Sequence, residues 1–266
     1  MKTVESLMNL KGRRALITGA AGGLGKIMTQ TLAELGADLV LIDLKEETLS
    51  AIANEAKKTW KVKVSVCHCD LESQSEREDL ISALNEDGHL DILVNNAAFV
   101  GTSGLEGWVV PFGEQSIEAW RRALEVNLIA AFHLCQGLSP LLTASGLGSI
   151  INIGSIYGEF GPDWGLYNDT TMGNPAAYAA SKGGLLQLTR WLATTMSPAV
   201  RVNAISPGGI YRGQNQLFVN RYEKRTPQGR MATEDDFRGV VAFLASDMSA
   251  YVTGQNISVD GGWGIW

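Results

Sequence analysis

The chain has 266 residues, a formal net charge of -6 and 45% apolar residues against 19% charged ones. This composition provides for a large core and excludes a disordered chain, because disordered chains combine few apolar residues with a high net charge. The acidic balance argues against nucleic acid and anionic membranes as main partners, and no apolar run approaches the length of a membrane span.

The N-terminal stretch does not resemble an export signal. Glu5 and Asn9 lie where a signal peptide would need its apolar segment. The three cysteines, Cys67, Cys69 and Cys135, are an odd number and lack metal-ligand spacing. We therefore expect a reduced, cytoplasmic protein without a metal site.

Short apolar runs alternate with amphipathic stretches along the whole chain. The runs predict strands at Arg14–Thr18, Asp38–Ile42, Val62–Cys67, Ile92–Asn95, Ser149–Ile153, Arg201–Ile205 and Asn256–Val259. The amphipathic stretches predict helices at Leu24–Leu35, Glu46–Thr59, Gln74–Asn85, Ile117–Leu138, Ala176–Thr195 and Glu234–Ala245. This alternation predicts an α/β fold in which right-handed crossovers join parallel strands. We expect one domain over residues 1–266, with a doubly wound, mostly seven-stranded parallel sheet and helices on both faces.

Two longer stretches, Glu159–Pro175 and Ser206–Thr233, lack a clear period and interrupt this alternation. Both follow predicted strands, so we expect them at the carboxyl ends of the sheet, where open α/β sheets bind ligands. We interpret them as substrate-loop insertions.

A glycine cluster follows the first strand, with Gly19, Gly23 and Gly25 in a Gly-x-x-x-Gly-x-Gly spacing. Gly22 and Leu24 complete the turn. Glycines there allow backbone N–H groups and a helix N-terminus to meet a pyrophosphate, although a tight strand-to-helix turn is the simpler explanation. The position directly after a strand favours dinucleotide binding.

Asp43 ends the second strand, 18 residues after Gly25. A carboxylate at this point can accept hydrogen bonds from both ribose hydroxyls of NAD and would repel the 2′-phosphate of NADP. The alternative is that Asp43 caps the helix that begins near Glu46.

Two further turns follow the third and fourth strands. Asp70 and Leu71 can reach the adenine, but on spacing alone Asp70 is equally well explained as a helix cap. Asn96, Ala97 and Ala98 suit a backbone that passes close to a ribose, although an ordinary turn explains them nearly as well.

Tyr178 and Lys182 lie four residues apart on a predicted helix and so share a face. A neighbouring ammonium and the positive nicotinamide would favour the phenolate and make Tyr178 a usable base. Ser155, after the fifth strand, can hold a substrate oxygen, and the amide of Asn127 can bind a water linked to the lysine. A turn hydroxyl and a helix-packing amide are the alternatives for these two residues.

Taken in order, these elements resemble the short-chain dehydrogenase/reductase family. The resemblance rests on Thr18–Gly25, Asp43, Asp70, Asn95–Ala98, Asn127, Ser155, Tyr178, Lys182, Pro207-Gly208 and Asp260-Gly261-Gly262. It implies a Rossmann-type subunit, a nicotinamide cofactor, hydride transfer between alcohol and carbonyl, and a homotetramer. It assigns acid/base chemistry to Tyr178. Lys182 would lower the pKa of that phenol and bind the nicotinamide ribose, Ser155 would orient the substrate oxygen, and Asn127 would anchor a relay water. Pro207, Gly208 and Ile210 would contact the cofactor.

Two features depart from the family pattern. Ser155 and Tyr178 are 23 residues apart, where about a dozen is usual. Tyr167 has the usual separation, but the residue four positions later is Thr171, which supplies no charge. In the family, a threonine after the Pro-Gly turn holds the carboxamide of the nicotinamide. The stretch Pro207–Arg212 contains no threonine, so the residue that makes this contact is open.

We predict an NAD-dependent oxidoreductase that acts on a sugar-like or other polar substrate. A reductase of 3-oxoacyl groups on a carrier protein is an alternative, since Arg121-Arg122 could meet an acidic carrier, although Asp43 disfavours NADPH. A non-catalytic NAD-sensing protein is another, and the complete catalytic set argues against it. A weaker resemblance points to dehydrogenases of bacterial surface-glycan and nonulosonate sugar biosynthesis.

Substrate contacts are expected from Trp164, Tyr167, Tyr211 and Arg212. The positive charges of Tyr211–Arg230 could bind a carboxylate or phosphate. Apolar residues around the two longest predicted helices, together with Trp263, Ile265 and Trp266, favour assembly into a tetramer.

Overall fold

The sheet is built outward from two adjacent central strands, β1 (Arg14–Thr18) and β4 (Ile92–Asn95), in a computed structural model that describes residues 2–266. The order is β3-β2-β1-β4-β5-β6-β7, and every pair is parallel. The remaining strands are β2 (Asp38–Asp43), β3 (Val64–His68), β5 (Gly148–Ile153), β6 (Val200–Pro207) and β7 (Asn256–Val259). The direction of winding reverses between β1 and β4, and at such a switch point the connecting loops part to leave a crevice.

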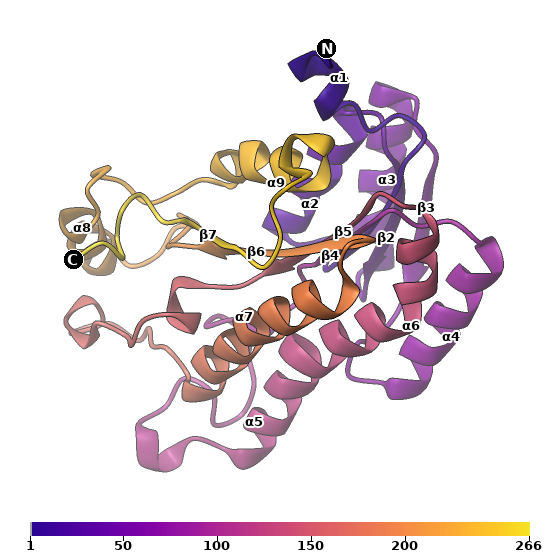
Figure 1. Ribbon diagram of the computed structural model, residues 1–266. Coiled ribbons are helices and arrows are strands. Elements are labelled where there is room, and N and C mark those ends of the chain that lie inside the picture. The colour runs from indigo at the N-terminus through magenta and orange to yellow at the C-terminus, as the bar shows by residue number, and fades with distance from the viewer. Residues whose placement is uncertain (1) are drawn as a thin grey trace.

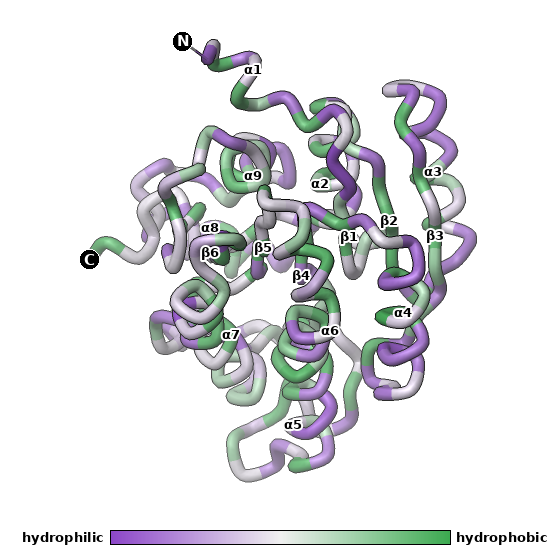
Figure 2. The backbone as a smooth tube through the Cα atoms, turned by 45° about the vertical axis from the view of Figure 1, so that its right-hand side comes forward, coloured by the Kyte–Doolittle hydropathy of each residue, from purple (hydrophilic) through white to green (hydrophobic). Residues whose placement is uncertain are grey.

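Helices cover both faces of the sheet (Figure 1). One face carries α2 (Gly23–Glu34), α3 (Glu46–Trp60) and α9 (Arg238–Ala245). The other carries α4 (Gln74–Asp87), α5 (Ile117–Leu124), α6 (Ala130–Ala144) and α7 (Ala176–Met196). Figure 2 shows the apolar central strands between these layers. Two buried clusters result, one on each face, so the predicted doubly wound Rossmann-type fold is confirmed.

The predicted helix Ile117–Leu138 is longer than expected and contains an irregular turn. A π turn, Glu125–Ile129, separates α5 from α6, and α6 continues to Ala144 past Pro140. By length and composition, Ile117–Ala144 is apolar enough to cross a membrane, with a mean hydropathy of 1.3 in its most apolar window. Our expectation that no run approaches this length was therefore wrong. The apolar residues of α6 pack in the core beneath the sheet.

The structure contains two helices that the sequence pattern did not predict. The first, α1 (Val4–Met8), buries none of its residues, so it has no apolar period. The second, α8 (Gln216–Arg225), lies within Ser206–Thr233 and buries only Phe218, Val219 and Tyr222. Part of this supposedly irregular stretch is therefore helical.

The two substrate-loop insertions pack against each other beyond the carboxyl ends of β5 and β6 (Figure 1, left). Leu166 and Tyr167 of the first insertion bury their side chains against Phe218 of α8, and the rings of Tyr167 and Phe218 lie 5.3 Å apart. Trp263 is 1% exposed and stacks on Tyr222, so it belongs to the core of this subunit. The insertions thus form one wall above the edge of the sheet.

Candidate active site

A cavity of about 1160 Å³ follows the carboxyl ends of the strands, from the glycine turn to the wall of the insertions. Of the predicted cofactor residues, it is lined by Gly19, Gly22, Gly23, Leu24, Gly25, Asp43, Asp70, Leu71, Asn96, Ala97, Ala98, Pro207, Gly208 and Ile210. Ser155, Tyr178 and Lys182 line the same space. The structure therefore brings the predicted binding and reacting groups into one cavity.

The glycine turn is fitted against the end of β4. A Cβ on Gly19 would lie 2.8 Å from Ala97 Cα, and one on Gly25 would lie 2.1 Å from Gly19 O, so neither position admits a side chain. The Thr18 hydroxyl accepts hydrogen bonds from the backbone N–H groups of Asn96 (3.0 Å) and Ala97 (3.1 Å). These contacts lock the two turns together.

The N-terminus of α2 opens into this cavity. Its N-cap is Gly22, which supplies no capping side chain. The N–H groups of the first helical turn have no partner within the helix and carry the positive end of the helix dipole. Such a terminus, reached by a glycine backbone, fits the diphosphate of a dinucleotide.

Asp43 and Asp70 do not cap helices. The carboxylate of Asp43 accepts from Ala21 N (3.0 Å) and Leu44 N (2.8 Å), and the N-cap of α3 is Lys45. Asp70 accepts from Glu72 N in a local turn, whereas Ser73 caps α4. Both side chains line the cavity, as expected if Asp43 binds the adenosine ribose and Asp70 reaches the adenine.

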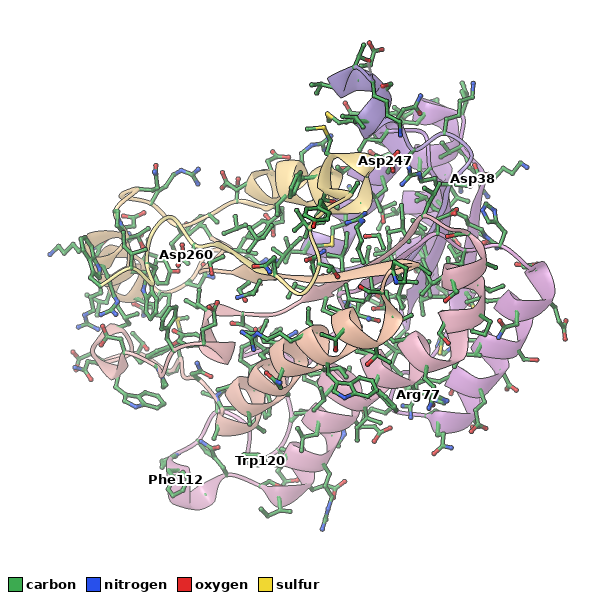
Figure 3. All side chains as sticks on the ribbon, in the orientation of Figure 1. Asp38, Arg77, Phe112, Trp120, Asp247 and Asp260 are labelled. Atoms are coloured by element: carbon green, nitrogen blue, oxygen red, sulfur yellow. The ribbon has the colours of Figure 1, made fainter. Side chains whose placement is uncertain are left out.

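The Pro207-Gly208 turn forms the opposite wall. Gly208 N donates to Val259 O (3.0 Å), and a Cβ on Gly208 would lie 2.8 Å from Asp260 Cα. Asp260 is labelled in Figure 3 at the end of β7, where its carboxylate accepts from the backbone of the C-terminal tail. Ile210 then pairs with Ala232 in a short parallel bridge.

Tyr178, Ser155 and Lys182 converge at the reacting end. Lys182 is 3% exposed, and its ammonium donates to Ile153 O (2.6 Å) and lies 5.9 Å from the centre of the Tyr178 ring. Burial raises the pKa of Tyr178, while a hydrogen bond with Ser155 and the charge of Arg212 lower it. The hydroxyl of Ser155 also accepts from Tyr157 N (3.1 Å), which fixes its position.

The electrostatics of this pair differ from our expectation that Lys182 lowers the pKa of Tyr178. Burial lowers the pKa of Lys182 itself to about 8, whereas burial raises that of Tyr178 above its usual value near 10. The pair therefore loses its first proton at a lower pH than the buried phenol alone would, and this step belongs to the pair rather than to either side chain. Ser155 and Arg212 are the groups that favour the phenolate.

Asn127 occupies the π turn between α5 and α6, a kind of turn that is frequent at functional sites. Its amide donates to Phe99 O (3.1 Å) and Ser181 Oγ (3.0 Å), and its oxygen accepts from Phe99 N (2.8 Å). Both amide hydrogens are therefore engaged, whereas the amide oxygen keeps a second acceptor site, so the expected contact with a relay water stays a prediction.

Of the predicted substrate residues, Tyr167 and Arg212 line the cavity, and Trp164 and Tyr211 do not. Trp164 is 57% exposed and lies on the outer side of Tyr167, with ring centres 5.8 Å apart. Tyr211 is 51% exposed. Tyr167 shares a hydrogen bond of 2.5 Å with the hydroxyl of Tyr157, which also lines the cavity.

Most of the arginines proposed to bind an anionic substrate are paired instead. Arg225 contacts Asp163 (2.9 Å) and Arg221 contacts Asp169 (3.3 Å), so both join the two insertions to each other. Arg230 forms two hydrogen bonds with Asp236. None of these three lines the cavity, and neither does Lys224, whereas Arg212 does.

Besides Tyr157, sequence reasoning missed two further residues at this site. Asn174 lines the cavity four residues before Tyr178, is 7% exposed, and neither of its amide atoms has a hydrogen-bond partner among residues 2–266. Its position just before Pro175 and the reacting helix was a signal that we overlooked. Glu234 forms an ion pair with Arg212 from the start of another element, and no local pattern marks that pairing.

Comparison with known proteins places these features in context. A sequence model described as "Enoyl-(Acyl carrier protein) reductase" matches residues 19–264. A tropinone reductase homolog of Arabidopsis thaliana is 36% identical, with 97% of this chain and 95% of the relative covered. The 3-oxoacyl-[acyl-carrier-protein] reductase of Thermotoga maritima is 33% identical, with 96% and 99% covered.

A solved structure agrees with this similarity. The gluconate 5-dehydrogenase of Burkholderia cenocepacia, in complex with NADP and tartrate, superimposes with a TM-score of 0.87 at 29% identity. The alignment covers 99% of this chain and all of that one. The similarity therefore includes both the glycine turn and the Tyr178–Lys182 helix.

Proposed function

Since the chain belongs to the short-chain dehydrogenase/reductase family, whose members interconvert alcohols and carbonyl compounds with a nicotinamide dinucleotide, we propose that it is an NAD-preferring dehydrogenase of a small, hydroxylated, sugar-like substrate. The observation that carries the proposal is the convergence of the glycine turn, Asp43, Ser155, Tyr178 and Lys182 on one cavity. A protein that only senses NAD has no need of this complete reacting end.

We propose a task in alcohol oxidation for each of these side chains. When bound, the nicotinamide supplies the hydride acceptor. The first turn of α2 and the backbone of Gly23 would hold the diphosphate, and Asp43 the adenosine ribose. Ser155 orients the substrate oxygen, and Tyr178 takes the hydroxyl proton as the carbonyl forms. In the reverse direction, the same phenol returns that proton.

NAD should be preferred over NADP because the Asp43 carboxylate lies where the adenosine ribose would bind. A 2′-phosphate there would face a like charge, and we expect a specificity constant for NAD at least about tenfold higher. Asp43→Ala should narrow that gap, and Asp43→Asn, which removes the charge but keeps an acceptor for Ala21 N, should narrow it as well. Equal specificity constants for the two cofactors in the unmodified enzyme would contradict the assignment.

A polar substrate is supported by the groups around Tyr178. The side chains of Asn174, Tyr157 and Tyr167 offer hydroxyl and amide groups at the reacting end of the cavity, where an acyl chain would need an apolar channel. The amide of Asn174 can both donate and accept, which matches a hydroxyl group. The resemblance to surface-glycan and nonulosonate sugar dehydrogenases is part of this proposal.

The carrier-protein reductase remains the second candidate because of the Thermotoga maritima relative. For that role Arg121 and Arg122 would have to be available to an acidic partner. Arg122 instead makes two hydrogen bonds of 2.7 Å to the carboxylate of Glu72, and the more exposed Arg121 pairs with Glu118 (3.4 Å). This pairing favours the sugar-like substrate.

A screen of oxidation rates tests the proposal directly. The enzyme would be assayed with NAD⁺ and NADP⁺ against sugars, sugar acids, sugar phosphates and nucleotide sugars, and with NADH and NADPH against a 3-oxoacyl thioester. We expect turnover of at least one hydroxylated substrate with NAD⁺. Reduction of the thioester alone would favour the carrier-protein reductase, and cofactor binding without turnover of any compound would favour the sensor.

We further propose that the enzyme is a cytoplasmic homotetramer. Trp191 on α7 (55% exposed) and Ile129 and Phe132 at the π turn and α6 (43% and 36%) expose apolar side chains on the face away from the sheet. Ile265 and Trp266 are exposed at the C-terminal tail (74% and 72%). Sedimentation should show a tetramer that Trp191→Glu dissociates into smaller species, whereas Tyr251→Glu, a fully exposed control, should not. A monomer at micromolar concentration would reject the assembly.

A further inference from the structure

An ion pair lies directly over the glycine turn. Arg212 Nε and Glu234 Oε1 are 2.9 Å apart. A Cβ built on Gly23 would lie 2.7 Å from Glu234 Oε1 and 3.0 Å from an Nη of Arg212. Gly23 is the first residue of α2, so a cation and an anion both lie at the helix terminus that faces the cavity.

Backbone contacts hold both partners in place. Tyr211 N donates to Ala232 O (2.8 Å), and Arg212 N donates to the side chain of Gln214 (2.7 Å). Glu234 begins a short 3-10 helix that ends on Phe237, which is 0% exposed. These contacts fix the main chains that carry Arg212 and Glu234 beside Gly23.

The charge of Arg212 acts along the cavity as well as at Gly23. It is one of the groups that lower the pKa of Tyr178. The guanidinium therefore lies against the helix terminus and within electrostatic range of the reacting phenol, in the cavity that both line. A dinucleotide that passes from the adenosine end at Asp43 to the nicotinamide end at Tyr178 must cross this point with its diphosphate.

The two charges of the pair have opposite effects on a diphosphate. A guanidinium forms bidentate, charge-assisted hydrogen bonds with phosphate oxygens as it does with a carboxylate. The carboxylate of Glu234 repels the same phosphate and competes for the same guanidinium. The Arg212 side chain is 49% exposed, so it is accessible to a ligand while it is paired.

We propose that Arg212 is a ligand of the cofactor diphosphate and that Glu234 holds it over Gly23 until the diphosphate takes the place of the carboxylate. This assignment rests on the proposed use of a dinucleotide. It moves Arg212 from the expected substrate contacts to the cofactor, at the turn where the family pattern has a threonine. No covalent step is involved, because one anionic partner of the guanidinium replaces another.

The test measures dissociation constants by calorimetry, without turnover. ADP-ribose contains the diphosphate, and adenosine is the matched ligand that lacks it. Arg212→Gln should raise the dissociation constant of ADP-ribose about tenfold or more and leave that of adenosine unchanged. Arg212→Lys should recover part of the lost affinity for ADP-ribose. Glu234→Gln, which removes the competing charge, should tighten ADP-ribose several-fold. Added salt should weaken the binding of ADP-ribose less in Arg212→Gln than in the unmodified protein.

Arg230→Gln is the matched control, because Arg230 pairs with Asp236 in the same segment but does not line the cavity. It should leave both dissociation constants unchanged. An unchanged constant for ADP-ribose in Arg212→Gln, or equal weakening of adenosine, would overturn the role of Arg212. Weaker ADP-ribose binding in Glu234→Gln would overturn the proposal that the diphosphate replaces the Glu234 carboxylate as the partner of Arg212. Failure of NAD, NADP and ADP-ribose to bind the unmodified protein would instead reject the proposed function, and this inference with it.

Discussion

Replacement of Tyr178 by phenylalanine is expected to lower kcat for alcohol oxidation by about a thousandfold or more, because it removes the hydroxyl that exchanges the proton with the substrate. The ring itself should stay in place, since it packs against the apolar cluster of Trp108, Ala119, Ala123 and Ala177, and that packing does not use the hydroxyl. The dissociation constant for NAD should change by no more than about twofold, because the phenol acts on the substrate.

Tyr167→Phe is the matched control for this experiment. Tyr167 has the residue separation from Ser155 that the family pattern favours, but its hydroxyl bonds to Tyr157 and it has no lysine one helical turn away. We expect Tyr167→Phe to alter KM and leave most of kcat. An inactive Tyr167→Phe variant together with an active Tyr178→Phe variant would show that Tyr167, in the insertion, is the acid/base.

The central strands of the sheet were predictable because they are buried on both faces. Runs such as Arg14–Thr18 and Ile92–Asn95 have the bounds that the sequence predicts, since burial on both faces favours apolar residues along most of each strand. Glycine and aspartate at the strand ends then located the cofactor side of the cavity. In a parallel sheet these ends meet at one edge whatever the loop lengths.

The insertions were not predictable to the same degree. Helix α8 contacts a small aromatic cluster rather than the sheet, so only three of its residues are buried and its period is weak. The ion pairs of Arg221 and Arg225 with acids of the other insertion join residues more than fifty positions apart. No local pattern encodes such a partner, and the charges were therefore interpreted as a substrate site.

At the reacting end, too, the sequence predicts some features and only the fold determines the others. The spacing of Tyr178 and Lys182 is a local helical property, and the structure places both in the cavity. The pH at which the pair loses its first proton depends on burial from every side, which sequence spacing does not contain. The pairing of Arg212 with Glu234 over Gly23 depends likewise on three segments that only the fold brings together.

Lys182→Met should reduce alcohol oxidation at pH 8 by about a hundredfold or more and move its pH profile to higher pH. Burial lowers the pKa of Lys182 to about 8, so in the unmodified enzyme the Tyr178–Lys182 pair loses its first proton near that pH and gains the base that oxidation requires. Without the amine, the phenol must ionise alone, and burial raises its pKa above the usual value near 10. Two pKa units correspond to about a hundredfold in the basic form at pH 8.

The measurement is kcat/KM for oxidation from pH 6 to 10.5 at saturating NAD⁺, with the unmodified enzyme and Lys182→Arg for comparison. The positive nicotinamide favours the basic form in every variant, so the prediction concerns the separation between their profiles rather than the absolute midpoints. Lys182→Arg keeps a charge that favours the phenolate but, as a guanidinium, supplies no titrating amine, so the midpoint of its profile should lie between those of the unmodified enzyme and Lys182→Met. A methionine variant that keeps the midpoint of the unmodified enzyme would show that Tyr178 ionises independently of Lys182. The lysine would then act only through the ribose and through the Ile153 carbonyl to which it donates.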